Sequence, residues 1–182
     1  MENSNKKTVN LRRIFAYVID WYLSSVFAGI PVLLLYSIDS GNTTIPSSLK
    51  EMSMNYAIIS GILAIFFVFI YYVIVPTFSH RGQTLGKKLL GIKVVAMDGS
   101  DVRLTTMIKR EILGAMIIEG AMVCSGSYFR QLIQLATNDK IYSTLGTIAS
   151  VITIISVVMI YTTKEKRMIH DFIGGTKVIE LT

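Results

Sequence analysis

Two acidic residues lie within apolar stretches of this 182-residue chain. Asp20 ends the stretch "RRIFAYVID", and Glu119 ends the stretch "KREILGAMIIE". A carboxylate near the centre of a bilayer is costly, so it needs a partner or water. Two carboxylates that share one site compete for a proton, and this arrangement suits exchange between protons and a cation. Asp20 and Glu119 are therefore the first candidates for transport chemistry.

Basic residues precede each of these acids. Arg13 lies seven residues before Asp20, about 10.5 Å along a helix axis and on nearly the same face. Arg110 lies nine residues before Glu119, about 13 Å along the axis. Because helical pairs reach only i,i+4, Asp20 is expected to meet a group from another segment, with Arg110 and the basic tail as candidates. A water-filled crevice or a protonated carboxyl is the alternative. Arg13 is expected to extend to the membrane interface.

Both acids also have a structural interpretation. Asp20 would then fix helix packing through hydrogen bonds to its carboxylate. Glu119 would cap a local kink in a stretch that is rich in glycine. The residue types alone leave the transport and the structural interpretations open.

The composition indicates an integral membrane protein of one domain, residues 1–182, because 52% of the residues are hydrophobic and the apolar runs are long. We expect an all-α protein with four transmembrane helices, at about 14–36, 56–75, 110–128 and 142–161. The second has 20 uncharged residues and is expected to end before Pro76. The third is short and has the weakest signal.

The basic residues indicate the orientation. With four spans, only Lys50, Arg130 and Lys140 of the 18 Lys and Arg residues lie on one side, and the other 15 lie with both termini. The positive-inside rule therefore predicts a protein of a cytoplasmic membrane with both termini on the cytoplasmic side. The net charge of +6 is explained by this pattern, so no nucleic acid partner is expected.

The middle loop is expected to form a small layer on the cytoplasmic side. Asp98-Gly99 lies between β-branched residues and predicts a β-hairpin turn. The segment "LTTMIKREIL" is typical of an amphipathic helix that leads into the third span. Lys87, Lys88 and Lys93 are expected to face anionic lipid headgroups.

Two cytoplasmic stretches resemble each other at an offset of 84 positions, Leu85–Val95 and Ile169–Ile179. Gly91 matches Gly175, and Lys93 matches Lys177. A duplicated helical hairpin would explain this, and chance similarity of apolar sequences is the alternative. If the duplication is real, the two stretches could pair as strands beneath the bundle.

Three motifs of this chain resemble the RDD family of bacterial membrane proteins, which is named for one arginine and two aspartates. The first is R-x-x-A-x-x-I-D, at Arg13–Asp20, and the second is the block Gln83–Val95. The third is R-x-x-H-D-x-x-x-G-T-x-V, at Arg167–Val178. The matching loop and tail residues include Gln83, Gly86, Lys87, Gly91, Arg167, His170, Asp171, Gly175 and Thr176. The resemblance implies a polytopic membrane protein that acts as a transporter, and sodium/proton antiport is suggested for some members.

The tail offers little enzymatic chemistry. His170 and Asp171 are neighbours on an expected helical extension, "KEKRMIHDF", so their side chains point about 100° apart and form no dyad. Asp171 is expected to pair with Arg81, Lys87, Lys88 or another basic group of the cytoplasmic layer. No metal-ligand spacing, nucleophile–base pair or cofactor fingerprint is present, so we expect no metal site, no cofactor and no enzymatic activity.

The leading hypothesis is therefore transport of an ion or small solute, with cation/proton exchange centred on Asp20. Four short helices make a narrow path, so a transporter of this size would be expected to form a homo-oligomer. The rival hypothesis is a membrane module without transport activity that binds a protein partner in assembly, secretion or immunity. It predicts that the loop Ser37–Asn55 or the tail carries the function.

Overall fold

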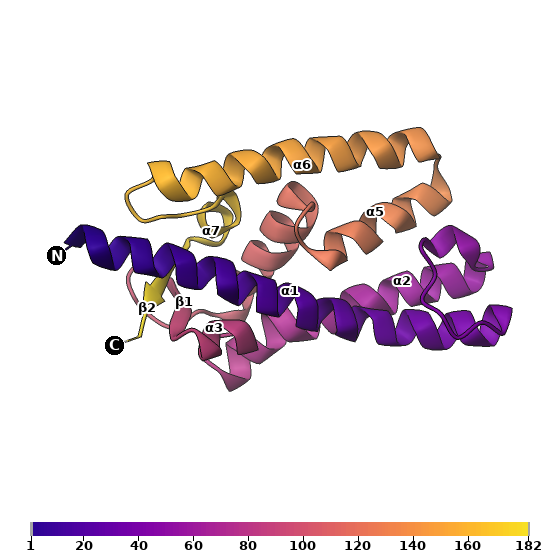
Figure 1. The fold of residues 1–182 in the computed structure, drawn as a ribbon, viewed down its shortest axis with the longest axis horizontal. Coiled ribbons are helices and arrows are strands. Elements are labelled where there is room, and N and C mark those ends of the chain that lie inside the picture. Colours follow the sequence, from indigo (N-terminus) through magenta and orange to yellow (C-terminus); the bar gives the residue numbers. More distant parts are fainter. Residues whose placement is uncertain (1, 182) are drawn as a thin grey trace.

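The computed structural model describes residues 2–181, and their side chains from residue 11 on. Helix α1, Glu2–Ser40, runs the length of the molecule (Figure 1). It packs against α2, Met54–Phe69, and its continuation η2, Ile70–Ser79. Ala28, Ala57 and Ala64 are fully buried in this core, and such small side chains allow the helix axes to approach closely.

The second hairpin is irregular in its first half. Helix α4, Leu104–Ile108, continues into the π-helix η3, Lys109–Glu119. Gly120 then adopts a left-handed φ of +57°, which ends the helix. Helix α5, Cys124–Ala136, follows at 58° to the first piece, and α6, Asp139–Thr162, returns along the bundle.

Three helices are long and apolar enough to cross a membrane, Leu11–Ser40, Met54–Ser79 and Asp139–Thr162, and the bent pair of η3 and α5 makes a fourth if it counts as one span. The all-α membrane architecture is confirmed. The expected end of the second span was wrong, because a π-helix carries the chain past Pro76 to Ser79. The expected third span, 110–128, was also wrong in its bounds, because the chain breaks at Gly120 and α5 runs to Ala136.

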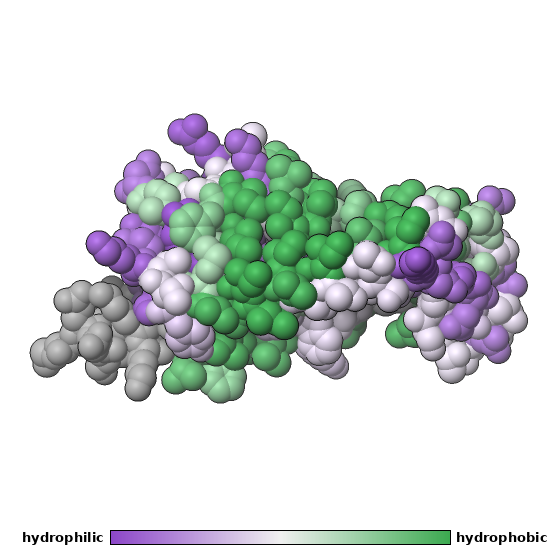
Figure 2. All heavy atoms as spheres, turned by 90° about the horizontal axis from the view of Figure 1, so that it is seen from above, coloured by the Kyte–Doolittle hydropathy of each residue, from purple (hydrophilic) through white to green (hydrophobic). Residues whose placement is uncertain are grey.

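The surface agrees with a membrane location. Figure 2 shows apolar side chains over the middle of the molecule and polar residues gathered toward its two ends. Large apolar side chains such as Phe15, Phe66 and Ile154 are exposed on the outer faces of the long helices. In a soluble protein such a belt would be a liability, but here it contacts lipid. The chain is therefore a multi-pass membrane protein.

A small polar layer closes the end of the bundle where both termini lie (Figure 1). It contains helix α3, Leu85–Leu89, and strand β1, Ile92–Ala96, from the middle loop. Helix α7, Ile169–Gly174, and strand β2, Thr176–Glu180, come from the tail. The tail is not the expected continuous helix, because α6 ends at Thr162 and α7 begins only at Ile169.

The two strands pair antiparallel, with Val94 opposite Val178. The expected hairpin around Asp98-Gly99 is only partly present. The turn forms, since Gly99 N–H donates to Ala96 O at 3.0 Å, but the chain after it adds a single bridge and β2 is the ladder partner of β1. Strand pairing between the two similar stretches was expected from a duplication, and this pairing is observed.

The opposite end of the bundle joins the two hairpins through their connecting loops. Residues 49–51 form a short 3₁₀ helix, η1 (Leu49–Glu51), after the end of α1. The Leu49 N–H donates to Gln131 Oε1 at 2.9 Å, and Lys50 Nζ lies 2.5 Å from Asp139 Oδ1. The connection between α1 and α2 and the connection between α5 and α6 therefore lie at the same end of the bundle, opposite the two termini (Figure 1).

Candidate functional site

Asp20 faces the interior of the bundle and is fully buried. Its Oδ1 accepts from Tyr71 Oη at 2.5 Å and from the Gly86 N–H at 2.8 Å. Its Oδ2 accepts from Thr84 Oγ1 at 2.5 Å, and Lys87 Nζ lies 3.5 Å away. The expectation of a partner from another segment is confirmed, but the partners come from η2 and α3 and not from Arg110. Lys87 therefore does not face headgroups as expected.

Gly86 makes this arrangement possible. A Cβ atom at this position would lie 2.5 Å from Ala16 O and 2.7 Å from Asp20 Oδ1. Only a residue without a side chain lets α3 approach α1 so closely. The conformation of the "TLGKK" stretch thus places the Thr84 hydroxyl, the Gly86 N–H and the Lys87 ammonium group around the carboxylate of Asp20.

Asp171 is the second fully buried carboxylate. Arg13 Nη2 lies 2.7 Å from its Oδ2, and Arg110 Nη2 lies 3.1 Å from its Oδ1. The Met168 N–H donates to Oδ2 at 3.0 Å. The named loop partners Arg81, Lys87 and Lys88 were therefore wrong. Asp171 pairs with other basic residues, because the short α7 turns it inward toward Arg13 and Arg110.

The charges around Asp171 control its ionisation. Burial alone would raise the pKa of Asp171, but neighbouring positive charge and the Met168 N–H outweigh burial and hold this pKa well below its usual range. The positive charge comes from Arg13 and Arg110, and from His170 when its ring is protonated. Asp171 is therefore ionised at neutral pH and joins the first helix to the last.

Glu119 has a third set of partners. Ser156 Oγ donates to Oε1 at 2.6 Å, and the His170 N–H donates to the same oxygen at 2.8 Å. The His170 ring Nδ1 lies 2.9 Å from Oε2, and its Nε2 lies 2.9 Å from Arg110 Nη2. His170 Nε2 and Asp171 Oδ1 are 3.7 Å apart, which is too long for a hydrogen bond. His170 therefore pairs with Glu119 and not with its neighbour in sequence.

The remaining motif residues of the tail and loop hold the polar layer together. Arg167 donates to the backbone oxygens of Thr176 and Asp171, both at 2.9 Å. Gln83 Nε2 donates to Ile92 O at 2.9 Å. Gly91 and Gly175 have positive φ angles of 65° and 62° before the two strands. These residues position the charged groups and do not line the cavity described next.

A cavity of about 340 Å³ lies between the two hairpins. Apolar side chains form most of its wall, and ionisable groups are set into it. The ionisable groups that line it are Arg13, Tyr17, Asp20, Tyr72, Lys87, Arg110, Glu111, Glu119 and His170. Asp20 and Glu119 line the same cavity, but each has its own hydrogen-bond donors, so they are not the coupled pair of carboxylates that we expected.

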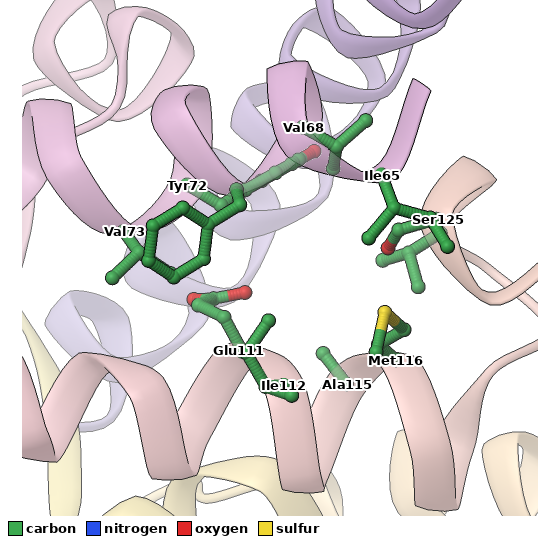
Figure 3. A pocket seen from close by; sticks show the side chains of 11 residues that line it. Ile65, Val68, Tyr72, Val73, Glu111, Ile112, Ala115, Met116 and Ser125 are labelled. Carbon is green, nitrogen blue, oxygen red and sulfur yellow. The ribbon is translucent and has the colours of Figure 1, made fainter. Parts of the chain in front are cut away.

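Sequence reasoning missed Glu111. This carboxylate is buried and pairs with Arg110 beside it. It also lines a much smaller pocket between η2 and η3, where its side chain points toward Tyr72 and Val73 (Figure 3). The signal available was an acid directly after Arg110 at the start of an apolar stretch. A charge at such a position is usually expected at the membrane surface. Here α4 adds a turn before η3, and Glu111 is buried inside the bundle.

Among the residues that the structure describes, no group of three or more His, Cys, Asp or Glu side chains could hold a metal ion. The buried carboxylates are instead distributed among arginine, lysine, hydroxyl and backbone donors. The arrangement can hold several charges in a low-dielectric interior, because each carboxylate has nearby donors.

Known proteins resemble this chain over most of its length. The model of the RDD family matches residues 9–175, which include all of the charged groups described above. The chain belongs to the RDD family. This RDD protein is 31% identical over 170 residues to "Uncharacterized protein YckC" of Bacillus subtilis (strain 168), covering 93% of this chain and 82% of the relative. No solved structure matches. Of the arginine and aspartates of the RDD motifs, Arg13 pairs with Asp171, and Asp20 has its own hydrogen-bond donors on the same cavity.

Proposed function

We propose that this RDD protein exchanges a monovalent cation for a proton across the membrane through the cavity between its hairpins. The observation that carries the proposal is a cavity of about 340 Å³ with carboxylates in its wall, inside a helical bundle that faces lipid. Ionisable residues inside a membrane are expensive, and those that face a cavity are candidates for an ion path.

The balance of buried charge supports exchange. The buried cluster has four carboxylates, Asp20, Glu111, Glu119 and Asp171. It has three permanent cations, Arg13, Lys87 and Arg110. Arg167 lies outside this cluster, because it binds backbone oxygens and stacks on Phe172 at 3.9 Å. The four carboxylates therefore exceed the three cations by one negative charge. This charge is balanced either by a proton, on His170 or on a carboxyl group, or by a bound cation.

The broken helix also supports transport. The chain leaves helical geometry at Gly120, and Met122 and Val123 of the break line the cavity. Interrupted helices beside a central site are common in transporters, where partial helix ends contact the substrate. In this proposal the break gives the second hairpin a hinge that the first lacks.

Asp20 takes a different role from the one that the sequence predicts. Three hydrogen-bond donors and an ammonium group already occupy its oxygens, and they tie α3 to α1. We propose that Asp20 positions α3 and that exchange occurs at other cavity carboxylates. We keep the proposed orientation with both termini in the cytoplasm, where the exposed Lys88 faces anionic headgroups.

Proteoliposomes that contain a pH-sensitive dye test the proposal. An inward gradient of Na⁺, K⁺ or Li⁺ should drive protons out of vesicles that contain the protein. The double variant Glu111→Gln/Glu119→Gln should abolish this flux, because it removes the charge of both remaining carboxylates that line the cavity. Asp98→Asn, at an exposed turn, is the matched control and should keep it. No flux with any of the three cations would contradict exchange and leave the partner-binding module as the hypothesis to pursue.

A further inference from the structure

The four buried carboxylates differ in how completely their oxygens are paired. Asp20 has three hydrogen-bond donors and the Lys87 ammonium group. Asp171 receives two guanidinium groups and a backbone N–H, and Glu119 receives Ser156 and two groups of His170. Glu111 has one partner, Arg110, which binds only Oε1.

That single partner is itself shared. Arg110 donates to Asp171 through Nε and Nη2, and its Nη2 also lies 2.9 Å from His170 Nε2. Only Nη1 is left for Glu111. The positive charge of Arg110 is therefore divided between two carboxylates, and Arg13 supplies a second cation to Asp171 alone. Glu111 is the carboxylate of this cluster with the least compensation.

The second oxygen of Glu111 keeps some accessible surface and has no hydrogen-bond partner among the described groups. Among the described side chains, the fully enclosed polar atoms without a partner are Ser60 Oγ and His80 Nδ1, so Glu111 Oε2 is not sealed in the protein. Glu111 lines both the large cavity and the small pocket beside Tyr72 (Figure 3). It also lies on a π-helical segment, a local geometry that is often found at functional sites.

We propose that Glu111 is the carboxylate that binds the exchanged ion, either one proton or one monovalent cation. The step is Glu111–COOH plus M⁺ giving Glu111–COO⁻·M⁺ plus H⁺. The O–H bond breaks, the proton leaves through the cavity, and the net charge is unchanged. The proposal rests on the proposed function for the movement of the ion, but binding at Glu111 can be measured without transport.

The surroundings favour a single positive charge at this place. Ionisable groups from four other elements lie around the cavity: Arg13 and Asp20 on α1, Tyr72 on η2, Lys87 on α3, and His170 and Asp171 on α7. The permanent cations among these groups already bind other carboxylates, since Arg13 binds Asp171 and Lys87 binds Asp20. A divalent ion would need several free carboxylates, and only Glu111 has a free oxygen. A proton or a small monovalent cation fits the one remaining charge.

A carbodiimide reagent provides the test, because it modifies protonated carboxyl groups in apolar surroundings. The purified full-length protein is treated with dicyclohexylcarbodiimide in detergent, and the modified peptides are identified by mass spectrometry. We expect modification at Glu111, a decrease of several-fold when NaCl, KCl or LiCl replaces choline chloride at equal ionic strength, and a decrease as the pH rises. Glu111→Gln should remove the modification, and Asp98→Asn, at an exposed turn, should retain it.

The possible outcomes separate this inference from the proposed function. Modification of Glu119 or Asp20 in place of Glu111, or modification that no cation reduces, would overturn the inference. Protection of Glu111 by a cation without flux in vesicles would support the binding site and remove transport. Full flux in Glu111→Gln would overturn the site and leave exchange standing. Because labelling is measured on the unmodified sequence, the inference is tested even if a variant fails to fold.

Discussion

Arg13 Nη2 and Asp171 Oδ2 lie 2.7 Å apart, although 158 positions separate the two residues in the chain. This contact joins the first membrane helix to the last short helix. Arg110 binds the same carboxylate from the second hairpin, so three elements meet at one buried charge. The cluster therefore holds the two hairpins together at the end where the termini lie.

Asp171→Asn should destabilise the protein strongly, because it leaves two buried guanidinium groups without their carboxylate. Loss of one partner of a buried ion pair costs about 3–5 kcal/mol. Thermal unfolding in detergent should show a large decrease in Tm. Asp98→Asn, at an exposed turn, should leave the Tm almost unchanged. Charge reversal at Arg13 should partly rescue Asp171→Arg, and reversal at Arg81 should not; rescue at Arg81 would contradict the ion pair.

The contribution of Asp171 should also depend on pH. Its folded pKa is depressed below the ordinary value of 3.8, so the stabilisation is fully present above that value and is lost as the pH falls toward the folded pKa. The difference in unfolding free energy between the unmodified protein and Asp171→Asn should be constant from pH 5 to 7. It should shrink by about 1.4 kcal/mol per pH unit below 3.8. A difference that grows on acidification would contradict the lowered pKa.

Gly86→Ala should disrupt the contact between α3 and α1, because the added Cβ would lie 2.5 Å from Ala16 O. Overpacking of this kind costs about 1–3 kcal/mol. Gly146→Ala is the matched control, because nothing lies within 4 Å of its added Cβ in α6. That change should be neutral or stabilise the helix by up to about 1 kcal/mol. Equal melting temperatures for the two variants would show that the close approach is not needed.

The orientation can be tested with single cysteines in a Cys124→Ser background. An impermeant thiol reagent added to intact cells should modify Ser40→Cys and Asn138→Cys, which lie in the two connections at the same end of the bundle. It should not modify Lys177→Cys in β2. Labelling at 177 before the cells are opened would reverse the proposed topology.

Much of the architecture follows from local sequence patterns. Apolar length predicted the spans, and the energetic cost of a buried charge predicted that Asp20 would face the interior. The similarity of two stretches predicted that β1 and β2 would pair. Each of these inferences depends on the composition of a short stretch of sequence or on the similarity of two such stretches.

The pairing of charges could not be predicted in this way. Asp171 was assigned to lysines and an arginine of the same loop layer, but its partner Arg13 is brought in by the packing of α1 against the tail. Glu111 was not singled out, because the length of the helix before it is not evident from the apolar pattern. The extension past Pro76 required a π-helix, which has no reliable sequence signal.

The register of the two strands agrees with the internal similarity of the chain. Val94 faces Val178, and the same two residues coincide when the chain is shifted by 84 positions onto itself. The shift also carries the Gly86 N–H, which binds Asp20, onto the His170 N–H, which binds Glu119. A separate hairpin of half this length could therefore form the same contacts with an identical copy, as a twofold-symmetric dimer does. After fusion of two such copies into one chain, equivalent positions could hold different residues. The shift superimposes Lys87 on Asp171, and these two residues carry opposite charges.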